Sequence, residues 1–300
     1  MPTKRLLVIG GDAAGMSTAS QARRMKGPEE LEIVAFERGP RTSYAACGLP
    51  YFVEGIVEPA EKLVARTPEQ FAKRDIEVHT GHEVTGIDTA ARTLEVVELA
   101  SGNTRTESWD ELVIGTGASG VRPPLPGIDS AGVMELRTVD DGIELDSTIA
   151  EGAKRAVVVG AGYIRIEVAE ALLARGLEVS VVELADAAMA TTLDPDLASE
   201  VTDALRDAGA DVLLGAGVEG FESTDGRLAA VVAGGRSIPA DVAVLGLGVR
   251  ANSGLAAAAG IEVGTAGGIV VDERMHTSAD GVWAAGDCVE SRNRVTGESM

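Results

Sequence analysis

The chain has 300 residues, of which 45% are hydrophobic, and a formal net charge of −21. This length suggests two domains, each with its own core, and the negative charge argues against nucleic acid or a membrane surface as a partner, since both attract clustered Lys and Arg. No apolar run approaches the ~20 residues that cross a bilayer, and two cysteines in such a chain are typical of a reducing compartment, so we expect a soluble cytoplasmic protein.

The N-terminal segment predicts a strand, a glycine turn, a helix and a second strand that ends in an acid. An apolar run at residues 5–9 leads into the glycine-rich turn 10–15, a helical pattern runs to Lys26, and an apolar strand at 31–36 precedes Glu37. Glycines in such a turn let the amides of a helix N-terminus approach a pyrophosphate, and the acid binds ribose hydroxyls. The segment therefore predicts a dinucleotide-binding unit.

A second copy of this pattern begins at Arg155. Residues 155–159 are apolar, residues 160–165 form a glycine turn, a helix is expected to about Arg175, and the strand 179–182 precedes Glu183. One such pattern alone is a weak signal, but two in one chain strongly favour dinucleotide binding.

Each copy departs from the G-x-G-x-x-G pattern at one glycine. Asp12 stands at the second glycine of the first copy, and Arg165 stands at the third glycine of the second copy. The third glycine permits close packing between helix and strand. We therefore expect the Arg165 side chain either to extend outward into solvent or to impair nicotinamide binding.

The remaining segments predict shorter strands and the domain boundaries. Residues 77–79, 82–85 and 93–97 alternate as antiparallel strands do, and 112–118 is a buried strand that ends in a glycine turn. The proline-rich stretch 121–127 and the stretch 246–250 mark two chain crossings. The expected fold class is α/β, with two Rossmann-like domains: residues 1–120 with 249–300, and an inserted domain of residues 121–248.

Cys47 is the candidate redox residue. It lies in the run Ser43–Tyr51 beyond the first nucleotide pattern, and no second cysteine follows nearby to form a dithiol. The residues after it can begin a short helix, with Pro50 in its first turn. A thiol at a helix N-terminus has a lowered pKa and is a better nucleophile. Cys288 is expected to be a packing residue, and His79, His82 and His276 lack the spacing of metal ligands.

These motifs resemble the pyridine nucleotide–disulfide oxidoreductase superfamily. Within it, the sequence is similar to the single-cysteine branch of coenzyme A-disulfide reductases, NADH-dependent persulfide reductases and water-forming NADH oxidases. The resemblance covers essentially the whole chain, and it rests on the Gly-Gly-x-Ala-Ala-Gly turn, the Ser-Tyr-Ala-Ala-Cys-Gly-Leu-Pro-Tyr run, Thr116-Gly117-Ala118 and Ala285-Gly286-Asp287-Cys288.

The resemblance implies roles for individual residues. FAD would bind in the first domain, at Gly10, Gly11, Ala13, Ala14, Gly15, Glu37, Arg38, Val84, Thr116, Gly117 and Asp287. NAD(P)H would bind in the inserted domain, at Gly160, Gly162, Tyr163, Ile164, Glu183 and Gly248. An acid at Glu183 favours the free 2′-hydroxyl of NADH over the phosphate of NADPH. Tyr163 matches an aromatic gate over the flavin, and Glu167 matches an acid near that gate.

The implied activity is an FAD-dependent NAD(P)H reduction of coenzyme A disulfide or a coenzyme A persulfide through Cys47. Gln21, Arg24, Ser43 and His79 fall at positions that contact coenzyme A in the family. The alternatives are a water-forming NADH oxidase that cycles through a cysteine sulfenic acid, and a flavin-binding module without turnover. Ala46 stands where the family has Asn, which weakens the coenzyme A assignment. Full-length relatives are homodimers with a further C-terminal domain, so we expect this chain to be truncated.

Overall fold

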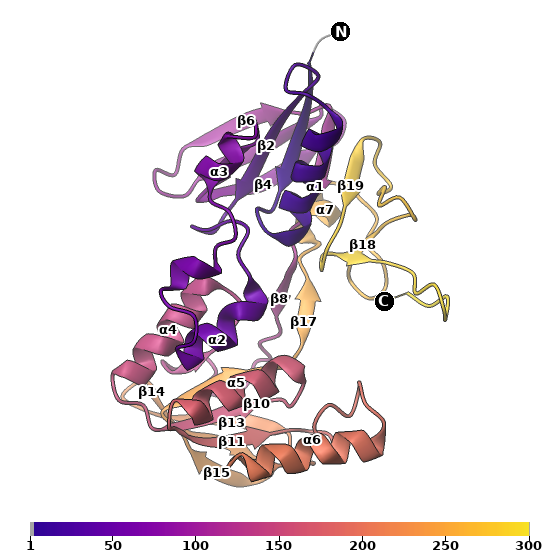
Figure 1. Ribbon diagram of the computed structural model, residues 1–300. Helices are drawn as coiled ribbons and strands as arrows, with labels where there is room; N and C mark the ends of the chain where they lie inside the picture. The colour runs from indigo at the N-terminus through magenta and orange to yellow at the C-terminus, as the bar shows by residue number, and fades with distance from the viewer. Residues whose placement is uncertain (1–2, 300) are drawn as a thin grey trace. The chain divides into compact units, whose positions relative to one another are not determined.

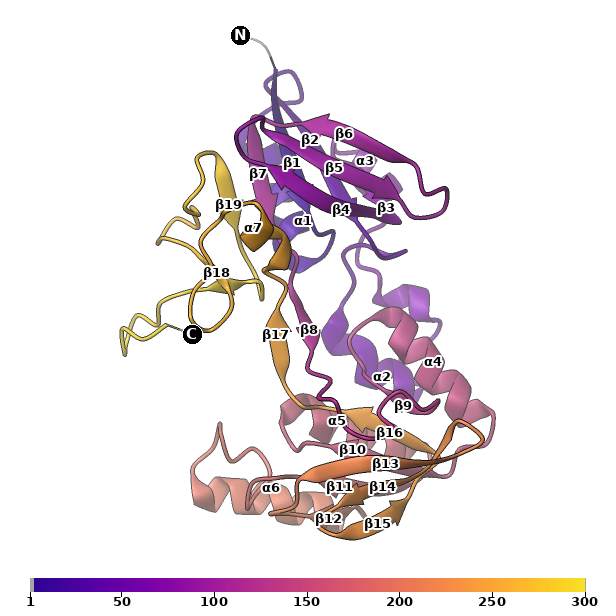
Figure 2. The ribbon, with the colours of Figure 1, turned by 180° about the vertical axis from the view of Figure 1, so that it is seen from behind.

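The computed structural model describes residues 3–299, and these residues form two compact units. The first unit contains the residues up to Tyr44, Val64–Ser119 and the residues from Val249 on, and the second contains Ala45–Leu63 and Gly120–Gly248. The chain passes between the units through β8 (Ala118–Gly120) and β17 (Val249–Ala251), which pair with each other (Figures 1 and 2).

The boundaries expected from the sequence differ from this division in one segment. Residues 45–63, which carry Cys47, were expected in the first unit, but they group with the second. The assignment of the units to FAD and to NAD(P)H stays a prediction.

The first unit is built on a five-stranded parallel sheet in the order β19-β7-β1-β2-β3. Its apolar strands have side chains buried on both faces, as parallel sheets require. The strands are β1 (Lys4–Ile9), β2 (Leu31–Glu37), β3 (Glu77–Thr80), β7 (Glu111–Ile114) and β19 (Val282–Ala284).

Different layers cover the two faces of this sheet. Leu6 and Val8 of β1 pack with residues of α1 (Ala13–Met25) and α3 (Pro68–Ala72). Leu7 and Ile9 point to the other face and pack with Val84, Leu94 and Val96. Those residues belong to an antiparallel meander of β4 (His82–Asp88), β5 (Thr93–Glu98) and β6 (Thr104–Ser108), which Figure 2 shows in front of the sheet. The C-terminal part of the unit adds α7 (Gly254–Ala258), β18 (Ile269–Val270) and β20 (Val289–Glu290).

One strand prediction was wrong in its pairing. Residues 77–79 were expected to be antiparallel, but β3 pairs in parallel with β2, with Phe36 opposite His79. Alternation of apolar and polar residues over so short a run does not specify whether the strand pairs in parallel or antiparallel, and β3 in fact has three successive half-buried residues.

The second unit repeats the same plan. Its sheet has the order β12-β11-β10-β16-β9, and the meander on one face contains Phe221, Leu228 and Val231, which pack with Val157 and Val159 of β10. The helices α5 and α6 lie on the other face (Figure 1). The elements are β9 (Val133–Met134), β10 (Arg155–Val159), α5 (Tyr163–Ala174), β11 (Glu178–Val182), α6 (Pro195–Asp207), β12 (Asp211–Leu213), β13 (Val218–Thr224), β14 (Arg227–Ala233), β15 (Arg236–Pro239) and β16 (Val242–Leu245).

The segment that carries Cys47 packs on two helices of this second unit. Cys47 lies in a 3₁₀ turn, Ala46–Gly48, which continues into α2 (Leu49–Glu54). The apolar side of α2 is buried, and its residues contact α4 (Val139–Ala150) and α5. A second 3₁₀ turn, Ala60–Leu63, leads out of the segment. Within the described part of the chain, no helix is both long and apolar enough to cross a membrane.

Candidate functional site

The glycine turn after β1 has the close contacts that a dinucleotide cradle needs. Gly10 has φ +102°, and a Cβ at this position would lie 2.1 Å from the carbonyl oxygen of Gly115. A Cβ on Gly15 would lie 1.9 Å from the carbonyl oxygen of Gly10. Only glycine fits at both positions, so the turn stays tight and the amides at the N-terminus of α1 remain open to a phosphate ligand.

Glu37 is fixed at the end of β2 by two backbone amides. One carboxylate oxygen accepts a hydrogen bond from the Gly11 N–H at 2.7 Å, and the other accepts one from the Gly39 N–H at 2.7 Å. The acid of the nucleotide pattern is therefore oriented beside the turn by the backbone itself. This arrangement fits a dinucleotide whose ribose reaches the carboxylate.

Two further loops meet this turn at the carboxyl ends of β7 and β19. Thr116 donates from its hydroxyl to the carbonyl of Asn252 at 2.7 Å, and the Asn252 side chain donates back to the carbonyl of Thr116 at 2.9 Å. Gly286 lies so close to α1 that a Cβ there would be 2.8 Å from the Ala14 Cβ. The exposed Asp287 therefore follows a loop that packs on the first turn of α1.

Asp12 is the N-cap residue of α1, yet one of its carboxylate oxygens is buried without a hydrogen-bond partner. Burial raises the pKa of Asp12, and the nearby Glu37 carboxylate raises it further, while backbone amides of Tyr44 and Ala13 oppose the shift. The acid at the second-glycine position is therefore easier to protonate than an exposed aspartate.

The second glycine turn reproduces the geometry of the first. Gly160 has φ +98°, and a Cβ there would lie 2.7 Å from the carbonyl oxygen of Gly246. The Glu183 carboxylate accepts hydrogen bonds from the Ala161 N–H at 2.6 Å and the Ala185 N–H at 2.8 Å. Glu37 and Glu183 are thus held in the same way, which supports a nucleotide site in each unit.

Arg165 is half-buried, and its side chain lies against the second glycine turn. A Cβ placed on Gly246 would lie 1.9 Å from the Arg165 Nε, so the side chain occupies the space that this glycine leaves open. Its Nε is buried without a hydrogen-bond partner, and burial together with nearby Arg137 lowers the guanidinium pKa. The inner part of the side chain, as far as Nε, is therefore packed against the turn, and both expectations for Arg165 stay predictions.

The other predicted cofactor residues lie around these two turns. Val84 is buried in β4, and Arg38 is exposed directly after Glu37. Tyr163 and Ile164 are exposed in the first turn of α5, Glu167 is exposed one turn later, and Gly248 adopts φ +88° after β16. The roles of these residues in cofactor binding stay predictions.

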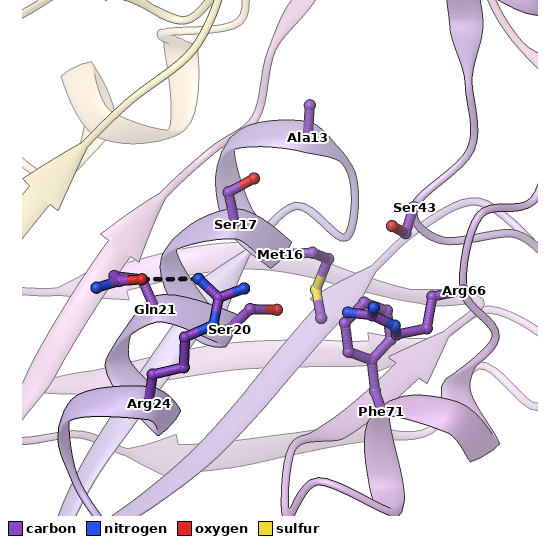
Figure 3. Close-up of a pocket in the computed structure, with 9 residues that line it drawn as sticks. All are labelled: Ala13, Met16, Ser17, Ser20, Gln21, Arg24, Ser43, Arg66 and Phe71. Carbon is purple, nitrogen blue, oxygen red and sulfur yellow. Dashed lines mark hydrogen bonds between the residues drawn. The ribbon is translucent and has the colours of Figure 1, made fainter.

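A pocket of about 390 Å³ lies beside α1 in the first unit. Figure 3 shows α1 side chains on one side of it and Ser43, Arg66 and Phe71 on the other. It brings together three of the four residues that sequence reasoning proposed for substrate binding: Gln21, Arg24 and Ser43. Gln21 accepts a hydrogen bond from Arg24 at 2.8 Å, which orients the guanidinium.

Sequence reasoning missed the second guanidinium of the pocket. The Arg66 guanidinium carbon lies 5.1 Å from the ring centroid of Phe71, which is buried in α3. The remaining residues that line the pocket are Ala13, Met16, Ser17 and Ser20. The signal that could have found Arg66 is the capping box of α3, Thr67 with Gln70, because it fixes the residue just before the helix.

His79 does not line this pocket. Its ring stacks on Phe36 with centroids 5.5 Å apart, and its Nε2 is 2.8 Å from a Glu77 carboxylate oxygen. Burial lowers the pKa of His79, with Arg105 and His82 acting in the same direction and Glu77 opposing them. His79 thus packs against Phe36 at the edge of the sheet, and its role in substrate binding stays a prediction.

The two cysteines differ sharply in exposure. Cys47 is exposed, whereas Cys288 is fully buried with its Sγ near the carbonyl oxygens of Ile114 and Ala285. The packing role expected for Cys288 is confirmed. An exposed thiol is accessible to a substrate, as the proposed role of Cys47 requires.

Comparison with known proteins identifies the family of this fold. A family model described as pyridine nucleotide-disulphide oxidoreductase matches residues 4–299. An NADH oxidase of Methanocaldococcus jannaschii is 36% identical over 98% of this chain and 65% of its own length. A CoA-dependent NAD(P)H sulfur oxidoreductase of Pyrococcus furiosus is 33% identical over 100% of this chain and 66% of its own length.

A solved structure supports the same assignment. A NAD-dependent persulfide reductase from A. fulgidus has a TM-score of 0.95 to this chain, with 38% identity over 99% of this chain and 55% of that one. The chain thus spans about two thirds of the length of these curated relatives.

Proposed function

Because the chain belongs to the pyridine nucleotide-disulphide oxidoreductase family, we propose that it uses electrons from NADH to reduce coenzyme A disulfide or a coenzyme A persulfide through Cys47. The observation that carries this substrate class is the pocket beside α1, where two guanidinium groups and several hydroxyl groups converge. Guanidinium groups suit phosphates because they donate paired hydrogen bonds, and coenzyme A carries a diphosphate and a ribose phosphate.

The cofactors are FAD and a pyridine nucleotide. When bound, FAD passes an electron pair from the nicotinamide to sulfur. Gly10, Gly11 and Gly15 would leave the amides of α1 open to its pyrophosphate, and Glu37 would accept hydrogen bonds from its ribose. Gly160, Gly162 and Glu183 would do the same for the pyridine nucleotide, and the Glu183 carboxylate favours NADH because it would repel a 2′-phosphate.

Cys47 would carry the exchange of sulfur. Its thiolate attacks one sulfur of the substrate disulfide, which forms a mixed disulfide at position 47 and releases the other half as a thiolate. Two electrons, supplied by NADH, then break the mixed disulfide and release the second thiol. Overall, one disulfide, one NADH and one proton give two thiols and NAD⁺, and the Cys47 thiolate is regenerated.

The test is the NADH-dependent reduction of coenzyme A disulfide by the flavin-loaded chain without oxygen. We expect NADH to be consumed only when the disulfide or a persulfide is present. We also expect Cys47→Ser to abolish that turnover while NADH still bleaches the flavin absorbance. Wild-type protein that bleaches with NADH but never produces coenzyme A thiol would disprove this substrate class.

A second candidate is a water-forming NADH oxidase in which Cys47 cycles through a sulfenic acid. Ala46 favours it, because the alanine lacks the side-chain amide expected at that position of the coenzyme A enzymes. NADH consumption that requires oxygen and ignores the disulfide would select this candidate. If NADH does not bleach the bound flavin, the chain is instead a flavin-binding module without turnover. The Arg165 side chain packed against the second glycine turn is consistent with that outcome.

We also propose where and how the whole protein works. An exposed free thiol such as Cys47 is best preserved in the reducing cytoplasm. The resemblance further suggests that the full-length protein is a homodimer that acts on a small molecule, with no nucleic acid or membrane partner.

A further inference from the structure

The helix that follows Cys47 ends at an arginine from another helix. Arg175 is the C-cap residue of α5, and its guanidinium donates hydrogen bonds to the Val53 carbonyl at 2.5 Å and to the Asp146 carboxylate at 2.7 Å. Val53 lies in the last turn of α2, where carbonyl groups have no partner within the helix. A cation at this end both satisfies a carbonyl and interacts favourably with the helix dipole.

The same helix is held at a second place by close packing on α4. Gly142 has no Cβ, and an added one would lie 3.3 Å from side-chain atoms of both Leu49 and Phe52. Leu49, Phe52 and Val53 are all buried. The glycine lets α2 approach α4, and Arg175 then links the end of α2 to both α4 and α5.

We propose that Arg175 is a positioning residue for the redox-active thiol. The 3₁₀ turn that contains Cys47 runs directly into α2, so the Val53 and Asp146 contacts of Arg175 fix the segment that carries the thiol. Arg175 also ends the helix whose first turn, at Gly162, belongs to the second nucleotide turn. The thiol segment and that turn are therefore attached to one rigid helix. Such positioning matters because small displacements of reacting groups reduce rates strongly.

The direct test is amide hydrogen exchange on the flavin-loaded chain with Arg175→Gln. Glutamine keeps a polar side chain but cannot reach both acceptors. We expect exchange in Ala46–Gly55 to become about tenfold faster or more, since local opening sets exchange rates. Arg206→Gln is the matched control, because Arg206 pairs with Asp203 within the same helix, α6. Exchange within twofold of the wild type in Arg175→Gln would overturn the proposal.

The kinetic test separates positioning from general damage, and it alone rests on the proposed function. We expect Arg175→Gln to leave the rate of flavin bleaching by NADH within about twofold, and to lower kcat for coenzyme A disulfide about tenfold or more with little change in KM. Arg175→Lys should restore part of kcat, because an ammonium can donate to both acceptors. Equal losses in both steps would refute a positioning role.

If Arg175→Gln does not fold, Asp146→Asn removes only the charged partner, and unchanged exchange in that variant would count against the proposal. If the wild-type chain reduces no disulfide, the proposed function fails while hydrogen exchange still decides the role of Arg175.

Discussion

Arg165 is the residue that departs furthest from a working nucleotide turn. Its side chain fills the space over Gly246, at the carboxyl ends of β10 and β16. The corresponding residue of the first unit is Gly15, where even a Cβ would collide with the backbone. A guanidinium buried without a partner at its Nε is costly, so the position is a natural target for substitution.

We expect Arg165→Gly to tighten NADH binding about tenfold, because it clears the space beside the turn. Titration of flavin bleaching with NADH measures this change. Arg165→Lys is the control, since it keeps a long cation and should gain nothing. Unchanged NADH affinity in Arg165→Gly would show that Arg165 does not impair the site.

Gly15 offers a sharper steric test in the first unit. We expect Gly15→Ala to weaken FAD binding at least about tenfold, because the new Cβ would lie 1.9 Å from the Gly10 carbonyl oxygen and force the turn apart. The measurement is flavin retained after gel filtration. Gly27→Ala is the matched control, since a Cβ there meets nothing within 4 Å. Equal flavin content in the two variants would contradict the cradle.

Arg66 tests the substrate assignment of the pocket. We expect Arg66→Ala to raise KM for coenzyme A disulfide about tenfold, because one phosphate contact is lost. The KM for pantethine, a disulfide that lacks the nucleotide part of coenzyme A, should stay the same. Steady-state kinetics with both substrates make the comparison. A similar rise for pantethine would mean that Arg66 does not bind the nucleotide part.

At the scale of elements, Asp241 joins the start of β10 to the start of β16. Its carboxylate accepts hydrogen bonds from the backbone N–H groups of Lys154 and Arg155, each at 3.0 Å, and from the Arg155 guanidinium at 2.7 Å. The Arg155 hydrogen bond is the main reason that the pKa of Asp241 falls to about 2. The pair holds together the amino ends of two neighbouring interior strands of this sheet.

This shift predicts a pH dependence of stability. A depressed pKa in the folded state means that Asp241 stabilises the fold above pH 4 and that this contribution disappears as the pH falls toward 2. We expect Asp241→Asn to cost about 1 kcal/mol at pH 7, after allowance for solvent screening, and much less at pH 2.5. Urea unfolding at the two pH values measures it. A difference independent of pH would contradict the ion-pair explanation.

At the scale of the whole molecule, the excess of acids is the dominant electrostatic feature. The sequence has 47 Asp and Glu against 26 Lys and Arg. Many cations are already paired, as in the network of Arg5 and Arg105 with Glu107 and Glu32. The unpaired acids repel one another and oppose the compact state.

We therefore expect the midpoint of thermal unfolding to rise by a few degrees between low and moderate salt, since ions screen the repulsion over about 10 Å at 0.1 M. Calorimetry in sodium chloride, with FAD held saturating, gives the measurement. A midpoint that falls with added salt would mean that surface ion pairs outweigh the net repulsion.

The sequence by itself determined the two strand–turn–helix–strand units, their acids and the lone cysteine. Local patterns suffice for these features, because glycines at a tight turn and an acid at a strand end are required by backbone geometry. It also predicted Gln21, Arg24 and Ser43, which one pocket brings together. Cys288 could be recognised as a packing residue from its apolar setting.

Only the tertiary structure decided the rest, because those features depend on residues far apart in sequence. The pairing of β3, the course of the Arg165 side chain over Gly246 and the position of Arg66 across from α1 follow from packing between elements. The attachment of the Cys47 segment through Arg175 is of the same kind, since it joins residues more than a hundred positions apart. No local pattern encodes such contacts, so they appear only when the chain is folded.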